Sequence, residues 1–171
     1  MKPLEAPDSL FLEAAEGWLG LGDWREANQE LERIRPELRR HPDVLKVRWT
    51  ICALAKDWDV SVEIGQLLVE VEPEESFGWV NHAYALRRSS AGGLQAAYHA
   101  LKPAAERFKD VEQVGFNLAC YACQLGALED ARQWLAKAFS AAVRHGTAAR
   151  LKHEALAESD LEPLWKEIRS I

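Results

Sequence analysis

The chain has 171 residues, of which 27 are acidic and 21 basic, so its formal net charge is −6 at pH 7. With 48% hydrophobic residues it can bury a core the size of one domain or a short repeat array. The acidic balance argues against general nucleic-acid binding, which needs a basic surface, and the lack of a long apolar run argues against membrane insertion.

The composition also predicts the type of secondary structure. Alanine and leucine, with 26 and 22 copies, far outnumber the 10 valines, 5 isoleucines and 2 threonines, which favours an all-α protein. The segment from Met1 to Glu5 lacks the hydrophobic stretch of a signal peptide, so we expect a cytoplasmic protein. Three cysteines are an odd number and do not suggest a disulfide framework.

A repeat of about 34 residues runs through most of the chain. The segments Gly22–Ala27 and Lys56–Ser61 both contain an Asp-Trp pair, and the two pairs are 34 residues apart. Continuing this register gives spacings of 34, 36 and 34, with the two extra residues inside the turn Ser89–Gly93. The positions that correspond to the tryptophan are Trp24, Trp58, Leu94 and Leu128.

Each unit divides into two predicted helices. The first helices are expected at Ser9–Leu21, Asp43–Ala55, Glu75–Arg88 and Glu112–Leu125. The second helices are expected at Trp24–Arg35, Trp58–Val71, Leu94–Phe108 and Leu128–Val143. The chain is therefore expected to form a single domain, 1–171, with repeats at 8–41, 42–75, 76–111 and 112–145 and capping helices at 146–171.

Local signals mark the ends of these helices. Pro36 and Pro103 are expected to kink or end the second helices of units one and three. Ser159–Glu162 has the spacing of a capping box, and leucines, Trp165 and Ile168 in the tail would cover the last repeat. The aspartates expected to cap helix N-termini are Asp8, Asp23, Asp57 and Asp110.

The repeat resembles the tetratricopeptide repeat (TPR) family, whose signature is W-x2-L-G-x2-Y, then A-x3-F, then P. Unit four carries the clearest match, in Asn117–Tyr121 and Gln124–Ala131. The resemblance implies an α-solenoid of antiparallel helix pairs, about four units long, that acts as a non-enzymatic scaffold for protein–protein interaction.

Unit two departs most from that pattern. Trp49 stands where the family has a small residue, and Gly65 stands where the family has a bulky one. We expect the indole of Trp49 to fill the space that Gly65 leaves. The other tryptophans of the repeat register are expected to pack in the core.

No motif for catalysis or metal binding is complete. Cys120 and Cys123 form a CxxC pair, but it lies in the middle of a predicted helix and no second pair could complete a zinc site. His153-Glu154 begins like HExxH, but the second histidine is missing. We therefore predict no catalytic residue, metal or cofactor.

The resemblance also implies a binding site, because in TPR proteins the first helices line a concave groove. Asn81 and Asn117 fall where the family uses an asparagine to hold a peptide backbone. Thr50 and Gln113 do not match the family's carboxylate clamp, so a complete clamp is not expected. The groove candidates are Lys46, Asn81, Tyr84, Arg87, Phe116 and Asn117.

These residues suit a protein or peptide partner with acidic and apolar anchors, and neither nucleic acid nor membrane. Three alternatives remain open. The first is a cytoplasmic chaperone for a secreted client, similar to the chaperones of type III secretion. The second is an enzyme, which would need His82, Cys120 and a carboxylate in one pocket. The third is an RNA-binding helical array.

Overall fold

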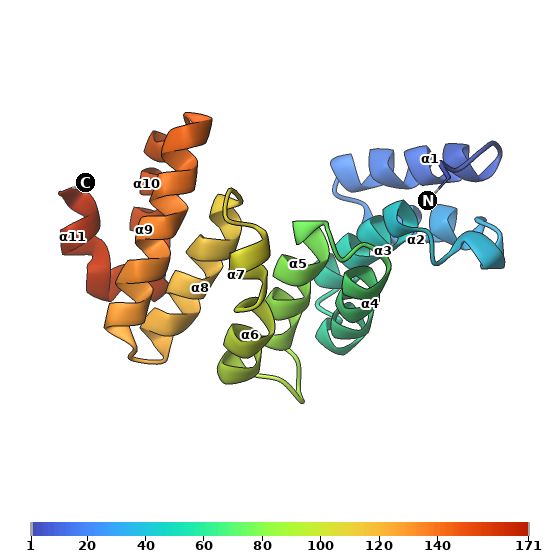
Figure 1. Cartoon of the computed structure of the whole chain (residues 1–171). Coiled ribbons are helices and arrows are strands. Elements are labelled where there is room, and N and C mark those ends of the chain that lie inside the picture. Colours follow the sequence, from blue (N-terminus) through green and yellow to red (C-terminus); the bar gives the residue numbers. More distant parts are fainter. Residues whose placement is uncertain (1, 171) are drawn as a thin grey trace.

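The computed structural model describes residues 2–170, and within these residues every regular element is a helix (Figure 1). Helices that follow one another in the chain pack against each other, and the pairs are stacked into an elongated, curved array. This is the all-α solenoid that the sequence predicts. None of the described helices is both long and apolar enough to cross a membrane.

The helices pair as the repeat predicts. The first helices are α1 (Asp8–Gly20), α3 (Pro42–Leu54), α5 (Ser76–Leu86) and α8 (Glu112–Gln124). The second helices are α2 (Trp24–Glu32), α4 (Trp58–Val71), α6 (Leu94–Leu101) with the short α7 (Ala104–Arg107), and α9 (Leu128–His145). A 3-10 turn, η1 (Pro36–Leu38), precedes α3, and the chain closes with α10 (Ala148–Ala157), the 3-10 helix η2 (Ser159–Leu164) and α11 (Trp165–Arg169).

Prolines shorten two of the second helices. Helix α2 ends at Glu32 and not at Arg35, and Pro36 then begins the 3-10 turn η1. Pro103 divides the helix predicted for Leu94–Phe108 into α6 and the four-residue α7. Proline lacks the amide hydrogen that an α-helix uses and its ring crowds the preceding turn, which explains both breaks.

Two of the four predicted aspartate caps are confirmed. Asp23 accepts hydrogen bonds from the amides of Arg25 and Glu26, and Asp57 accepts one from Val60. The prediction is wrong for Asp8, which lies inside α1, and for Asp110, which forms an ion pair with Arg144. The capping box predicted at Ser159–Glu162 is also wrong, because the side chain of Glu158, and not that of Ser159, caps η2.

The close approach of α4 and α5 explains Gly65. A Cβ atom at Gly65 would lie 2.7 Å from the Cα atom of His82, which is closer than a real Cβ approaches another atom. His82 of α5 therefore takes the space beside Gly65, and the prediction that Trp49 fills it is wrong. The indole of Trp49 instead meets the rings of Phe77 and Tyr84 edge to face, at centroid distances of 6.1 and 6.3 Å.

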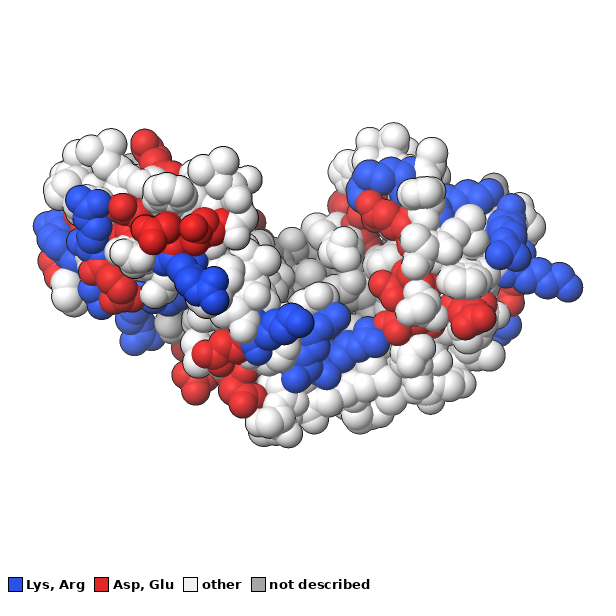
Figure 2. Space-filling view, turned by 180° about the vertical axis from the view of Figure 1, so that it is seen from behind, with Lys and Arg blue, Asp and Glu red and all other residues white. Residues whose placement is uncertain are grey.

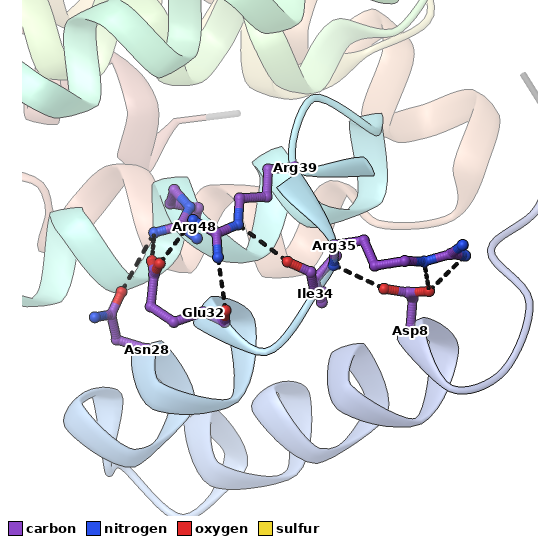
Figure 3. A network of polar contacts seen from close by, with 7 residues as sticks. All are labelled: Asp8, Asn28, Glu32, Ile34, Arg35, Arg39 and Arg48. Carbon is purple, nitrogen blue, oxygen red and sulfur yellow. Dashed lines mark hydrogen bonds and ion pairs between the residues drawn. The ribbon is translucent and has the colours of Figure 1, made fainter. Parts of the chain in front are cut away.

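A polar network joins the first two units (Figure 3). The buried carboxylate of Asp8 accepts hydrogen bonds from the backbone amide and the guanidinium of Arg35, each 2.8 Å long. Arg39 donates to the carbonyl oxygens of Glu32 and Ile34, which ties the turn after α2 to the end of that helix. The network is completed from α3 by Arg48, which contacts Glu32 and Asn28. The bonds of Asp8 and Arg39 thus hold unit one together, and those of Arg48 connect unit two to it.

The Asp8 carboxylate makes the stability of this end of the chain depend on pH. The hydrogen bond from the Arg35 amide, followed by the bond and charge of the Arg35 guanidinium, lowers the pKa of Asp8 below its ordinary value of 3.8. A lowered folded-state pKa stabilises the fold above the unfolded-state pKa, and this stabilisation is lost as the pH falls through the folded-state pKa. We expect Asp8→Asn to weaken the fold at pH 7 and the difference from the parent to shrink below about pH 4. Urea denaturation across this pH range measures it, with Glu13→Gln on the exposed side of α1 as control; an equal loss at both pH extremes would contradict the assignment.

Candidate functional site

The first helices form one continuous layer of the array. Helix α1 contacts α3, α3 contacts α5, and α5 contacts α8, so side chains from different units lie next to one another. Seen from behind, the molecule is hollowed between its N-terminal and C-terminal ends, with basic side chains gathered at the lower edge of the hollow (Figure 2). A surface of this form can hold a segment of another chain.

A small cleft opens between the first three of these helices. Its volume is about 240 Å³, and its walls come from three successive units. The apolar part is formed by Leu19 of α1 and Phe77 of α5, and the polar part by Glu16, Lys46 and Thr50. Among the predicted groove residues, Lys46 is the one that lines this cleft.

Lys46 already has carboxylate partners in its own chain. Its ammonium nitrogen lies 2.7 Å from a carboxylate oxygen of Glu72 and 3.8 Å from one of Asp43. Burial disfavours the charged amine, but the hydrogen bond and charge of Glu72 outweigh burial and raise the pKa of Lys46. A partner carboxylate would therefore meet a lysine that is fully charged and held in place by Glu72.

Tyr84 lies at the centre of an aromatic cluster that the guanidinium of Arg88 contacts. The Arg88 guanidinium lies 3.5 Å from the centroid of the Tyr84 ring and 5.5 Å from that of Trp58. The Tyr84 ring also meets Trp49 and Trp58 edge to face. These residues come from α3, α4 and α5, so the sequence predicts each tryptophan's place in the repeat without predicting that they meet at Tyr84.

The side chain of Asn81 forms a hydrogen bond inside its own helix. Its side-chain amide donates a 2.9 Å hydrogen bond to the carbonyl oxygen of Phe77, one turn earlier in α5. The side-chain oxygen of Asn81 takes no part in that bond. Asn81 is half-buried, so it lies beside the cleft residues without being sealed in the core.

Of the other predicted groove residues, Arg87 contacts the C-terminal segment, and Phe116 and Asn117 are buried. Arg87 forms an ion pair with Asp160 of η2, and the hydrogen bond from this pair raises the pKa of Arg87. Helix η2 packs on α8, where Phe116 and Asn117 are 8% and 9% exposed. Asn117 accepts a 2.8 Å hydrogen bond from Gln113. Lys46 thus lines the cleft, and Asn81 and Tyr84 of α5 are partly exposed without lining it. Phe116 and Asn117 are buried.

The cysteines of α8 are packed in the same core. Cys120 and Cys123 are free thiols that are 4% and 5% exposed. Burial raises the pKa of both, which disfavours the thiolate that redox or metal chemistry needs. Within residues 2–170, no group of three or more His, Cys, Asp or Glu side chains is placed to hold a metal ion.

No protein-family model and no curated protein matches the sequence. The structure of MamA MSR-1 C2 superimposes with a TM-score of 0.66 at 19% identity, over 83% of this chain and 82% of that one. TTC0263, a thermophilic TPR protein in Thermus thermophilus, also gives a TM-score of 0.66, at 17% identity over 96% of this chain and 100% of its own. The chain has the tetratricopeptide-repeat fold. The resemblance in the sequence is therefore confirmed at the level of the fold.

Proposed function

We propose that this TPR-fold chain is a non-catalytic binding module, and that its open groove between α1, α3 and α5 holds a segment of a partner protein. The observation that carries the proposal is the cleft shared by these three helices, with Lys46 at its polar side and Phe77 at its apolar side. A preformed groove on stacked helices loses little conformational entropy when a partner segment binds.

The side chains around the cleft suggest the chemistry of the partner. Leu19 and Phe77 would accept an aliphatic or aromatic side chain. Lys46, whose charge is already balanced by Glu72 and Asp43, would donate a remaining N–H to an oxygen of the partner. Outside the lining of this cleft, Arg88 lies over the Tyr84 ring and forms no ion pair with a carboxylate of the described residues, so it is a positive charge that a partner carboxylate can meet. A segment that places one apolar anchor in the cleft and an acidic residue at Arg88 therefore fits best.

The experiment compares partner recovery by the parent chain and by a groove variant. We expect Lys46→Gln combined with Tyr84→Ala to reduce recovery of the main partner from native-cell extract at least about tenfold, because both sides of the groove lose contacts. Quantitative mass spectrometry after affinity capture measures it. The control is Lys56→Gln with Val60→Ala, because Val60 of α4 is 38% exposed, close to the 37% of Tyr84, and does not line the cleft. Thermal melts check that each variant is folded. Equal recovery by the parent and the groove variant would contradict the proposal.

A further inference from the structure

The outer side of α9 is left uncovered in its C-terminal half. Helix α9 has 18 residues, whereas α7, the last part of the preceding second helix, has only four because Pro103 interrupts it. The exposed stripe of α9 includes Ala136, Ser140 and Val143, and Val143 is 67% exposed. Small residues one turn apart allow another helix to approach closely.

Two clefts border this stripe, one on each side. The first, about 540 Å³, lies between α7 and α9, with Phe108 and Trp134 in its wall. The second, about 790 Å³, lies between α9 and α10, with Phe139 and Val143 in its wall. Both clefts are lined by Ala136, Ser140 and Arg144, so they meet along the crest of α9. Together they form one apolar surface, which we call the α9 surface.

The α9 surface is basic although the whole chain is acidic. From Ala131 to His153 the sequence has five lysines and arginines and no aspartate or glutamate. Two of the bordering cations have carboxylate partners, because Arg144 lies 2.6 Å from Asp110 and Lys109 lies 3.5 Å from Glu106. Lys137 lies 3.9 Å from Glu106, at the limit of an ion pair, and Lys152 donates to an uncharged backbone carbonyl. Of the residues that line the two clefts, only Glu106 is acidic, whereas four are lysines or arginines.

We propose that the α9 surface is a docking site for an acidic amphipathic helix of another protein. The helix would cross α9 at Ala136 and Ser140, place aliphatic side chains in both clefts, and direct its carboxylates to Lys137 and Lys152 at their edges. Charge complementarity and the apolar lining are both needed for such a partner. A nucleic acid fits less well, because the clefts are apolar and the ammonium of Lys137 already lies 4.2 Å from the centroid of the Trp134 ring. This site does not involve the groove between α1, α3 and α5.

The test uses a labelled model helix and the full chain. The probe is a capped peptide of about 18 residues with leucines at i, i+4 and i+7 positions and glutamates on both flanks of that stripe. We expect fluorescence anisotropy to show micromolar binding that Val143→Glu weakens at least about tenfold. The matched control is Val60→Glu, since Val60 is an exposed valine of α4 outside the α9 surface. A second probe with lysines in place of the glutamates is expected to bind at least about tenfold more weakly than the acidic probe.

Several results would overturn the proposal. The first is that the acidic probe does not bind at about millimolar concentration. The second is that the Val143→Glu variant binds the acidic probe as tightly as the parent does. The third is that the parent binds the lysine probe as tightly as the acidic probe. Sedimentation of the chain alone tests a further contradicting result, which is self-association through this surface. A dimer that Val143→Glu dissociates would show that a second copy of the chain occupies the surface. Binding of a single-stranded RNA probe that Val143→Glu abolishes would assign the surface to nucleic acid.

Discussion

Replacing Leu161 with alanine is expected to lower the free energy of unfolding by about 2–5 kcal/mol. Leu161 is fully buried, and it belongs to the large hydrophobic cluster that joins units three and four to the C-terminal segment. Removing most of its side chain loses apolar burial and leaves a cavity beneath η2, on the face of α8. Urea denaturation followed by circular dichroism measures the loss. Leu10→Ala, at a leucine that is 57% exposed, is the control and should change stability by no more than about 0.5 kcal/mol.

The same variant tests whether the C-terminal segment seals α8. Cys120 is buried in the cluster that contains Leu161, while Cys52 is half-buried in another part of the chain. We expect Leu161→Ala to speed labelling of Cys120 by a thiol reagent under native conditions and to leave labelling of Cys52 nearly unchanged. An equal acceleration of both thiols would mean that the chain unfolds as a whole, without separate opening of the segment.

The sequence predicts the pairing of the helices well, because periodic signals encode it. The Asp-Trp pairs at Asp23 and Asp57 mark the turns between paired helices, and both aspartates cap the helices that follow. Alanine at Ala27 and Ala97 in the repeat register is fully buried, as expected where helices cross closely. Each of these features depends on neighbours within one or two units, so a repeat of 34 residues contains the information.

The candidate site is less predictable, because part of it depends on residues outside the repeat. The ion pair between Arg87 and Asp160 joins positions that are 73 residues apart, and Asp160 lies in the tail. The repeat pattern does not predict the path of that tail, and therefore it does not predict that η2 packs on α8. For this reason the sequence suggests an open groove at Phe116 and Asn117, which are buried in the structure. The broken helix at Pro103 was predictable, but the uncovered surface of α9 follows only when α7 and α9 are seen side by side.

The exchange of Trp49 and Gly65 shows the same limit at the level of a single residue. A glycine in a helix lowers stability relative to alanine unless something needs the space. The sequence suggests that Trp49, the large residue of the same unit, fills the space beside Gly65. In the structure His82 of the next unit fills that space. Contacts between units depend on the crossing angle and distance of helices, which a pattern of residue sizes does not determine.

Gly65→Ala and Gly17→Ala are therefore expected to change stability in opposite directions. At Gly65 the new Cβ would lie 2.7 Å from the Cα atom and 2.9 Å from the Cβ atom of His82, so α4 and α5 must move apart. Overpacking of this kind should lower the free energy of unfolding by about 1–3 kcal/mol even after the gain in helix propensity. Nothing lies within 4 Å of a Cβ at Gly17 in α1, so the substitution there should add about 0.5–1 kcal/mol.

Chemical denaturation of the two variants and the parent shows whether packing or helix propensity determines the change in stability. Both variants replace glycine with alanine inside an α-helix, so the gain in propensity is similar and the packing differs. If Gly65→Ala also stabilised the chain, the close crossing of α4 and α5 would be wrong. Because α5 carries Phe77, Asn81 and Tyr84, a displacement of α5 from α4 would also move one wall of the cleft away from Lys46. We therefore expect Gly65→Ala, and not Gly17→Ala, to weaken partner recovery, which connects the packing of one glycine to the shape of the proposed groove.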